Sequence, residues 1–402
     1  MTHLPPGLVE RLVAGALEGR RDDELFGGLC EDLAAEGVPI LRGSLGTQFL
    51  HPTQDVRLIR WVRGQGVEAE TLDRRPDGAP EDELWLRSPP YHLVSHGEQV
   101  LRRRVDRASI AEFPILADFA ALGGKDYLAL RQPLGARAVL GALDGVFLSW
   151  LTDRDAGFSA GEAALLERLA PQVVLAWAAV GNAWIGRALL ETYLGRDAAR
   201  RVLEGNIVRG RTETIRAVVW YSDLRGFTRL ADTLPAAEVL ALLNDYVEPV
   251  VEAVTGEGGE VLKFIGDGVL AIFGGREPPD ACAAALRAWE RSRGAAEAIS
   301  ARRAALGAAV TRPYLALHDG EVLYGNFGAP ARLDFTVLGP AVNDAARLAA
   351  LSRSLDQPLI VSDAFAATCG PARDRLVALG RFALRGVARP QMLWTLDSGD
   401  TG

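Results

Sequence analysis

Two aspartates in the second half of the chain each follow a short hydrophobic segment. Asp223 lies in YSDLRGFT, directly after the apolar run 217–221, and Asp267 lies between two glycines in EVLKFIGDGVLAIFGG. We expect Asp223 at the end of a strand, before a tight turn and a helix. We expect Asp267 at the tip of a hairpin that joins strands 261–265 and 269–273. A turn that leads into a helix presents backbone N–H groups to an anion, so this spacing indicates a metal and phosphate site.

Either aspartate alone has a simpler explanation, because Asp is favoured in turns for its local hydrogen bonds. The two together, with their flanking residues, favour the functional interpretation. Two carboxylates combined with phosphate oxygens suit magnesium, which seldom takes a complete set of protein ligands. Two such ions about 4 Å apart can hold the attacking and leaving oxygens of an in-line displacement.

Residues 212–396 resemble the catalytic domain of class III adenylyl and guanylyl cyclases. The resemblance rests on five segments in the family's order: YSDLRGFT (221–228), EVLKFIGDGVLAIFG (260–274), ALHDGEVLYGNFG (316–328), RLDFTVLGPAVNDAARL (332–348) and GRFALRGVARPQMLWTL (380–396). It implies an α+β fold with a ferredoxin-like sheet and a head-to-tail homodimer with active sites at its interface. The implied reaction converts ATP to cyclic AMP and pyrophosphate.

The resemblance gives roles to the residues around the two aspartates. Asp223 and Asp267 match the metal-binding aspartates, and the carbonyl of Leu224 matches a backbone metal ligand. Phe227 and Thr228 fall in the turn that holds the triphosphate. The implied cofactors are two Mg²⁺ or Mn²⁺ ions in each active site.

The resemblance also names four residues that the second chain of the dimer would supply. Lys263 matches the position that contacts the purine, and Thr336 matches its partner; guanylyl cyclases typically carry Glu and Cys at this pair. Asn343 matches the residue that orients the ribose, and Arg347 matches the arginine that stabilises the reacting phosphate.

The chemistry of these side chains agrees with their implied roles. Lysine is only a donor, so it suits the ring acceptor of adenine, whereas the corresponding nitrogen of guanine carries a proton. Thr336 can donate or accept, and it therefore permits adenine without strongly excluding guanine. Asn343 and Arg347 lie four residues apart, on one face of a helix, and arginine offers a fixed fork of donors to a phosphate.

Two alternatives remain open at this point. The protein could be a guanylyl or mixed-specificity cyclase, or a non-catalytic nucleotide or ligand sensor that keeps the fold. The complete polar set opposes the sensor. The sequence departs from the family pattern at Pro340, where Asp or Asn is common, and at Asp344, where an apolar residue is usual.

The first part of the chain resembles a GAF-type sensory domain, on residues 147–177. There a hydrophobic strand is followed by a polar loop, a phenylalanine, a Ser cap and a long helix. Ser159 and Glu162 have the spacing of a capping box. We therefore expect a GAF-like α/β domain over 1–182, a helical connector over 183–211 that breaks at 205–206, and the cyclase domain over 212–398.

Four residues of the first part, Cys30, His51, His92 and His96, could be imagined around a metal or a haem, although scattered residues of these types are more often structural. The signal that this domain would sense is unknown from the sequence.

Composition narrows the class of partner. A formal charge of −8 argues against nucleic acid as the main partner, because a backbone binder needs a basic face. Three widely spaced cysteines and an N-terminus without an apolar signal core favour a cytoplasmic protein. Residues 169–186 are uncharged and reach the lower length limit of a membrane span, but we expect a buried helix there and no membrane span.

Overall fold

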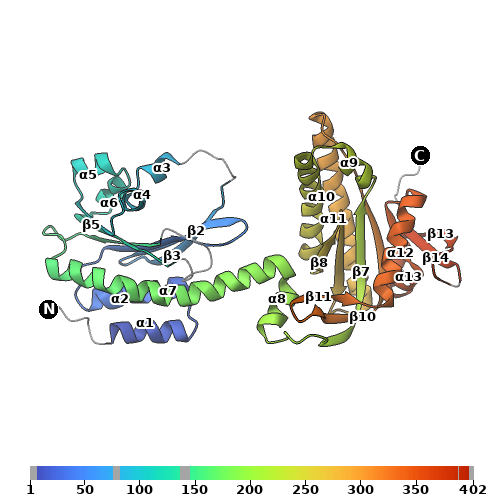
Figure 1. Cartoon of the computed structure of the whole chain (residues 1–402), viewed down its shortest axis with the longest axis horizontal. Coiled ribbons are helices and arrows are strands. Elements are labelled where there is room, and N and C mark those ends of the chain that lie inside the picture. Colours follow the sequence, from blue (N-terminus) through green and yellow to red (C-terminus); the bar gives the residue numbers. More distant parts are fainter. Residues whose placement is uncertain (1–6, 76–81, 136–144, 388, 398–402) are drawn as a thin grey trace. The chain divides into compact units, whose positions relative to one another are not determined.

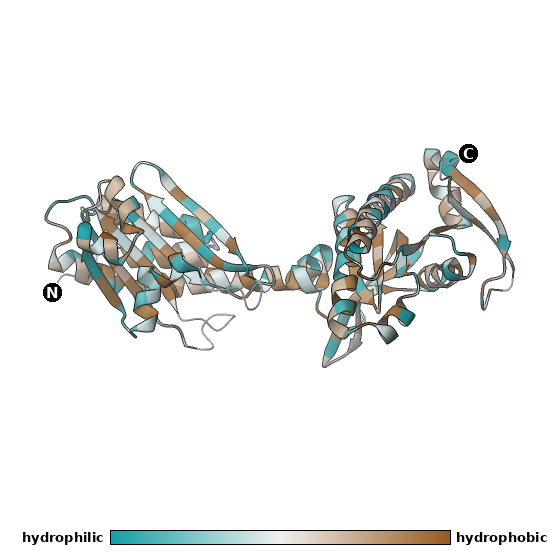
Figure 2. Ribbon diagram, turned by 90° about the horizontal axis from the view of Figure 1, so that it is seen from above, coloured by the Kyte–Doolittle hydropathy of each residue, from teal (hydrophilic) through white to brown (hydrophobic). Residues whose placement is uncertain are grey.

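The computed structural model describes residues 7–75, 82–135, 145–387 and 389–397. The chain divides into two compact units, Met1–Leu189 and Leu190–Gly402. Each unit is built on its own sheet, and both sheets carry hydrophobic stretches along their strands (Figure 2).

The N-terminal unit contains a six-stranded antiparallel sheet in the order β3-β2-β1-β6-β5-β4. Its strands are β1 (Arg42–Gln48), β2 (Gln54–Val62), β3 (Gly66–Asp73), β4 (Val100–Arg104), β5 (Asp126–Gln132) and β6 (Val146–Thr152). Branched and aromatic residues in the sequence predict strands at 57–62, 127–130 and 145–151, and these ranges overlap β2, β5 and β6.

Helices cover both faces of this sheet (Figure 1). One side carries α1 (Leu8–Leu17), α2 (Asp22–Ala35) and α7 (Ala160–Leu194); the other carries α3 (Glu83–Leu86), α4 (Pro89–Ser95), α5 (Arg107–Glu112) and α6 (Leu116–Ala121). The first side holds the larger core, in which Phe26 stacks on Trp150 with ring centroids 5.7 Å apart. A smaller core around Leu116 and Leu151 lies on the second side.

The capping box predicted for the last helix of this unit is confirmed. The amide of Glu162 donates to Ser159 Oγ at 3.2 Å, and the amide of Ser159 donates to Glu162 Oε2 at 2.6 Å. Among the described residues, α7 alone has the length and composition of a membrane-spanning helix. Its residues Leu169, Val173 and Trp177 are buried in the core of the N-terminal unit, and 39% of its most apolar stretch is buried.

The connector agrees with the prediction in part. The helix α8 (Arg196–Leu203) ends just before Gly205, which has φ 93°, so the break expected at 205–206 is present. A further break that was not predicted lies at Gly195, because α7 ends at Leu194 and α8 is a separate helix. Gly195 has φ 83°, and a Cβ there would lie 3.0 Å from the carbonyl oxygen of Val261. Because this close approach is tertiary, the helical pattern of the sequence could not reveal it.

The C-terminal unit contains an eight-stranded sheet in the order β13-β14-β12-β10-β7-β9-β8, with β11 paired to β10. Its strands are β7 (Thr212–Leu224), β8 (Glu260–Ile265), β9 (Gly268–Gly274), β10 (Pro313–Ala329), β11 (Arg332–Leu338), β12 (Leu359–Ser362), β13 (Leu376–Phe382) and β14 (Gln391–Leu396). Its further helices are α9 (Phe227–Thr233), α10 (Ala236–Gly256), α11 (Pro278–Ala305), α12 (Pro340–Leu355), α13 (Asp363–Thr368) and a 3₁₀ helix (Gly370–Arg375).

The first four strands of this unit follow the chain order strand, helix, two strands, helix, strand, and lie in the order β10-β7-β9-β8. This is the arrangement of a ferredoxin-like sheet. Alternate residues of β7 face opposite sides: Val218 and Trp220 pack in the core with α10 and α11, whereas Val219 packs with Ala341 and Ala345 of α12. Because alternate residues of β7 face opposite sides, the pattern specifies the register of the strand. The polar residues at its C-terminal end therefore lie where the strand leaves the sheet.

Candidate active site

The hairpin β8–β9 brings Asp267 to the end of β7, where Asp223 lies. Ile265 pairs with Gly268, which leaves Gly266 and Asp267 as a two-residue turn, as predicted. A Cβ on Gly268 would lie 2.3 Å from the carbonyl oxygen of Ser222, so this position requires glycine for the hairpin to approach β7.

One backbone amide joins the two carboxylates. The N–H of Leu224 donates to Asp223 Oδ1 at 2.9 Å and to Asp267 Oδ2 at 3.0 Å. Both carboxylates therefore converge on a single point at the end of β7. Asp223 is the more enclosed of the two, with 10% of its side chain exposed.

The electrostatics of the pair are those of two acids that share a site. Burial, reinforced by a hydrogen bond and the charge from Asp267, raises the pKa of Asp223 to about 7. Arg353 acts in the opposite direction, with its Nη2 2.6 Å from Asp223 Oδ2. The pair therefore binds a proton or a cation more readily than an isolated carboxylate would.

A divalent cation fits this donor set. The carboxylates of Asp223 and Asp267 and the carbonyl of Leu224 are hard oxygen ligands, which Mg²⁺ and Mn²⁺ prefer. Across the described ranges, no group of three or more His, Cys, Asp or Glu side chains is placed to hold a metal. A cation at Asp223 and Asp267 would thus complete its coordination with substrate or water oxygens, as Mg²⁺ commonly does.

Phe227 and Thr228 begin α9, immediately after Gly226 at φ 66°. Phe227 packs partly against the core that contains Leu224, while Thr228 is exposed. The tight turn and helix start expected after Asp223 are therefore present, and they bring Thr228 to the surface four residues beyond Leu224.

Lys263 is paired with Asp334, which lies on the same strand as Thr336. Lys263 Nζ lies 2.7 Å from Asp334 Oδ2, and Asp334 precedes Thr336 by two residues on β11. Thr336 is 2% exposed, and its Oγ1 has no hydrogen-bond partner among the described residues. A buried hydroxyl without a partner is unusual, because most buried polar groups have a hydrogen-bond partner.

Asn343 and Arg347 lie in α12, which begins at Pro340 in its first turn. Asn343 is exposed. Arg347 Nη1 lies 2.6 Å from Asp344 Oδ1, so the residue that departs from the family pattern is an ion-pair partner of the arginine. Within the part of the chain that the structure describes, no hydrogen bond or ion pair joins the two aspartates to either residue.

Sequence reasoning missed two residues at the other end of α12. Arg353 is the ion-pair partner of Asp223, and Asp356 accepts from Arg225, Arg312 and Tyr314. Arg353 lies 130 positions from Asp223 in the sequence, and no local pattern connects them.

The four scattered residues of the N-terminal unit do not form a site together. His92 stacks on His96 at 4.1 Å, His51 stacks on Trp184 at 6.0 Å, and Cys30 is fully buried. Each thus has its own packing partners.

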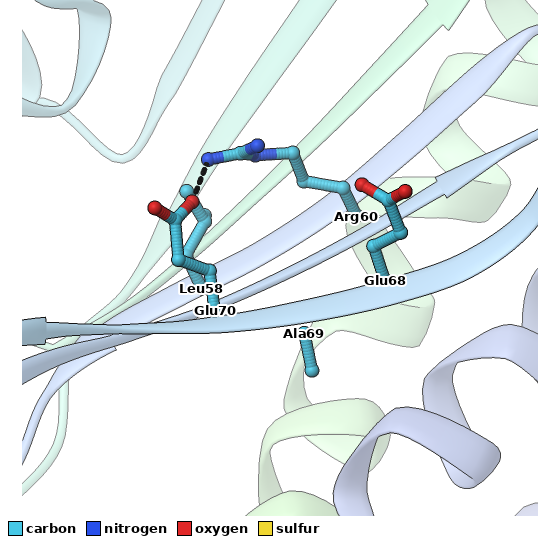
Figure 3. Close-up of a pocket in the computed structure, with 5 residues that line it drawn as sticks. All are labelled: Leu58, Arg60, Glu68, Ala69 and Glu70. Atoms are coloured by element: carbon cyan, nitrogen blue, oxygen red, sulfur yellow. Dashed lines mark hydrogen bonds and ion pairs between the residues drawn. The ribbon is translucent and has the colours of Figure 1, made fainter.

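A surface hollow of about 310 Å³ lies on strands β2 and β3 of the N-terminal unit (Figure 3). Its lining residues are Leu58, Arg60, Glu68, Ala69 and Glu70. Arg60 is paired with Glu70 at 2.5 Å across it. The hollow is separate from the two aspartates, which belong to the C-terminal unit.

No family model matches the chain. In sequence, it is 37% identical over 180 residues to an uncharacterized protein of Mycobacterium tuberculosis, a match that covers 44% of this chain and 30% of that protein. It is 28% identical over 214 residues to adenylate cyclase 1 of Rhizobium meliloti, covering 49% of this chain and 32% of the relative. It is also 28% identical over 158 residues to an adenylate cyclase of Anabaena cylindrica, covering 39% and 32%.

Solved structures of cyclases are also similar to this chain. The adenylyl cyclase CyaB from P. aeruginosa is 26% identical with a TM-score of 0.43, over 47% of this chain and 97% of that one. The guanylyl cyclase Cya2 is 26% identical with a TM-score of 0.41, over 46% and 93%. The chain spans about a third of the length of the curated relatives it matches. About half of this chain is therefore similar to part of curated adenylate cyclases.

Proposed function

We propose that this protein is an adenylyl cyclase that converts ATP to 3′,5′-cyclic AMP and pyrophosphate. The observation that carries the proposal is the convergence of Asp223 and Asp267 on the amide of Leu224. It occurs at the end of a central strand, in a chain with adenylate cyclase homologues. The ribose 3′-hydroxyl gives up its proton to solvent and its oxygen attacks the α-phosphorus, the bond from that phosphorus to the bridging oxygen breaks, and pyrophosphate leaves.

The residues around the aspartates hold the phosphate end of the substrate. Asp223, Asp267 and the carbonyl of Leu224 would bind two Mg²⁺ or Mn²⁺ ions, which when bound lower the pKa of the 3′-hydroxyl and neutralise phosphate charge. The turn at Phe227 and Thr228 faces the triphosphate.

Lys263 and Thr336 select the base. Lys263 donates to the adenine ring acceptor, and its ion pair with Asp334 restricts where the ammonium group can lie. The buried Thr336 hydroxyl, which lacks a partner among the described residues, can donate to or accept from the exocyclic edge of the purine. The same ambivalence makes a guanylyl or mixed cyclase the second candidate.

The complete site forms between two chains. One chain contributes the aspartates, and its partner contributes Lys263, Thr336, Asn343 and Arg347. In support, the ion-pair partner of Asp223 within one chain is Arg353, while Arg347 pairs with Asp344. Asn343 orients the ribose, and Arg347 places its donors on the phosphate as charge develops there.

The N-terminal unit is proposed as a GAF-like sensory domain that regulates the cyclase in the cytoplasm. Its six-stranded antiparallel sheet with helices on both faces supports this assignment, as does the capped α7 that leads into the connector. The residues over 183–211 would carry the signal, whose chemical nature is unknown.

One assay tests these proposals. The purified full chain is incubated with Mn²⁺ and labelled ATP or GTP, and cyclic products are separated chromatographically. Cyclic AMP formed in preference to cyclic GMP supports an adenylyl cyclase, and the reverse preference supports the second candidate. Nucleotide binding without either product would overturn the enzymatic proposal and leave a sensor. Asp267→Asn protein, prepared in parallel, controls for contaminating cyclases.

A further inference from the structure

At the C-terminal end of α12, one positively charged and one negatively charged side chain contact residues at the end of β7 and the start of β10. Arg353 pairs with Asp223, and Asp356 pairs with Arg225 and Arg312. We propose that these two residues are internal counter-ions for the cation-binding and polyphosphate-binding groups of the site, and that a divalent cation and a polyphosphate replace them. This inference deepens the proposed function and rests on it.

Arg353 contacts the carboxylate oxygen of Asp223 that does not accept the amide of Leu224. Oδ1 of Asp223 accepts the amide of Leu224, and Oδ2 lies 2.6 Å from Arg353 Nη2. The Asp223 side chain is only 10% exposed, whereas that of Arg353 is 56% exposed. A buried carboxylate beside a second one requires a positive partner, and an exposed arginine can leave at little cost. A cation that binds Oδ2 must therefore compete with Arg353.

Asp356 has a left-handed backbone conformation, and its carboxylate contacts three side chains. Among the described residues, it is the only one other than glycine with positive φ, at φ 51° and ψ 35°. Its Oδ1 accepts from Arg312 Nη2 at 2.5 Å and from the Tyr314 hydroxyl, and its Oδ2 lies 3.1 Å from Arg225 Nη2. An oxyanion held by two arginines and a hydroxyl is bonded as a phosphate oxygen would be. The left-handed conformation costs free energy, and it is tolerated best by Asn, Asp and Gly.

The strand register places these arginines beside the aspartate pair. Tyr314 is the β10 partner of Asp223, and Pro313 is the partner of Leu224. The amide of Arg225 donates to the carbonyl of Arg312 at 2.9 Å. A polyphosphate on a cation at Asp223 would thus extend toward Arg225 and Arg312, where the carboxylate of Asp356 now lies.

The two counter-ions lie three residues apart at one helix end. A small displacement of this end would open both ion pairs, so cation and polyphosphate should favour each other's binding. The two sets of ion pairs also offset the repulsion between the carboxylates of Asp223 and Asp267 and the repulsion between the guanidinium groups of Arg225 and Arg312.

The test measures binding to the full chain without nucleotide. Mn²⁺ binding is followed by electron paramagnetic resonance of the free ion, and inorganic tripolyphosphate binding by calorimetry in EDTA. Arg353→Met should tighten Mn²⁺ binding by about fivefold or more, because the competitor is removed. Asp356→Asn should tighten tripolyphosphate binding by about the same factor. Arg353→Lys, which keeps the charge, should lie closer to the wild type.

Matched controls come from ion pairs in other parts of the same unit. Arg291→Met removes a partner of Glu257, and Glu290→Gln removes a partner of Arg375; neither should change either affinity. Asp356→Gly removes the carboxylate and accepts the left-handed backbone, so it repeats the test if Asp356→Asn does not fold.

Unchanged or weaker Mn²⁺ binding by folded Arg353→Met, or unchanged or weaker tripolyphosphate binding by folded Asp356 variants, would overturn the inference. Wild-type protein that binds neither probe would also overturn it. The cyclase assay distinguishes failure of the counter-ion inference from failure of the proposed enzymatic function. Product formation with no change in these affinities removes only the counter-ion role, whereas the expected affinity changes without product formation remove only the enzymatic proposal.

Discussion

Lys263 Nζ lies 2.7 Å from Oδ2 of Asp334, which precedes Thr336 by two residues. The contact joins β8 to β11, the strand that carries Thr336, and it restricts where the ammonium group of Lys263 can lie. The two residues proposed to read the base therefore lie on strands that this ion pair connects. This relationship makes base selectivity sensitive to changes in either strand.

Exchanging both base-reading residues should change the preferred nucleotide. Lys263→Glu with Thr336→Cys removes the donor for the adenine ring acceptor and supplies an acceptor for guanine. We expect kcat/KM for ATP to fall relative to that for GTP by about tenfold or more, the loss of one charged hydrogen bond. Initial rates with both nucleotides give this ratio. A ratio equal to that of the wild type would show that these residues do not contact the base.

Removing either metal-site charge should abolish turnover. Asp223→Asn or Asp267→Asn deletes a charged ligand while preserving shape, and we expect activity to fall by at least about a hundredfold. Cyclic AMP formation and thermal unfolding are measured side by side. Asp245→Asn, which alters an ion pair with Arg302 and Arg303 on α11, is the matched aspartate control. Near-normal turnover in either site variant, with unchanged melting, would contradict the metal assignment.

Two inactive variants should restore each other if the site is shared. Asp223→Asn and Arg347→Ala homodimers should each be nearly inactive. After mixing at equal amounts, half of all dimers are heterodimers, and each has one intact site of two. Activity should therefore recover to about a quarter of wild type if association is statistical and the sites are independent.

Subunit exchange has to be demonstrated separately, by pull-down of differently tagged chains. A site built within one chain gives no recovery at any mixing ratio, because every chain carries a lesion. Confirmed exchange with no recovered activity would therefore refute both the interface site and the head-to-tail dimer.

The raised pKa of Asp223 predicts how its replacement affects stability. Its pKa is about 7 in the folded protein and about 3.9 in an unfolded chain, so its contribution to stability is present below pH 4 and is lost as the pH rises through 7. In EDTA, Asp223→Asn should raise Tm relative to wild type at pH 8, and the difference should shrink at pH 5. Calorimetry at both pH values checks this. An equal difference at the two values would contradict the raised pKa.

Local sequence patterns were sufficient to predict that Asp223 lies at the end of a strand and Asp267 in the turn of a hairpin. The apolar run 217–221 marked the end of β7, although the strand begins earlier, at Thr212. Its first residues are polar and pair with β10, so their strand conformation comes from the neighbouring strand and not from hydrophobic alternation. The glycines around Asp267 likewise indicated the hairpin, because a two-residue turn needs them.

Contacts between distant segments could not be predicted in this way. The pairing of Lys263 with Asp334 spans 71 residues, and that of Asp223 with Arg353 spans 130. Neither Arg353 nor Asp356 belongs to a recognisable spacing, since their roles follow from where α12 ends against β7 and β10. Sequence reasoning therefore proposed groups that would act on the substrate, but it missed Arg353, the ion-pair partner of Asp223, and the arginines around Asp356.

The break at Gly195 has a practical consequence for building chimeric proteins. Ala198 and Ala199 of α8 are buried in the core of the C-terminal unit, and Gly195 fits against Val261 of β8. A foreign input module joined after residue 203 would therefore delete part of that core, although the sequence suggests a junction near residue 205. Fusion points ahead of Leu194 preserve α8 and its glycine, and with them the contacts that α8 makes in the C-terminal unit.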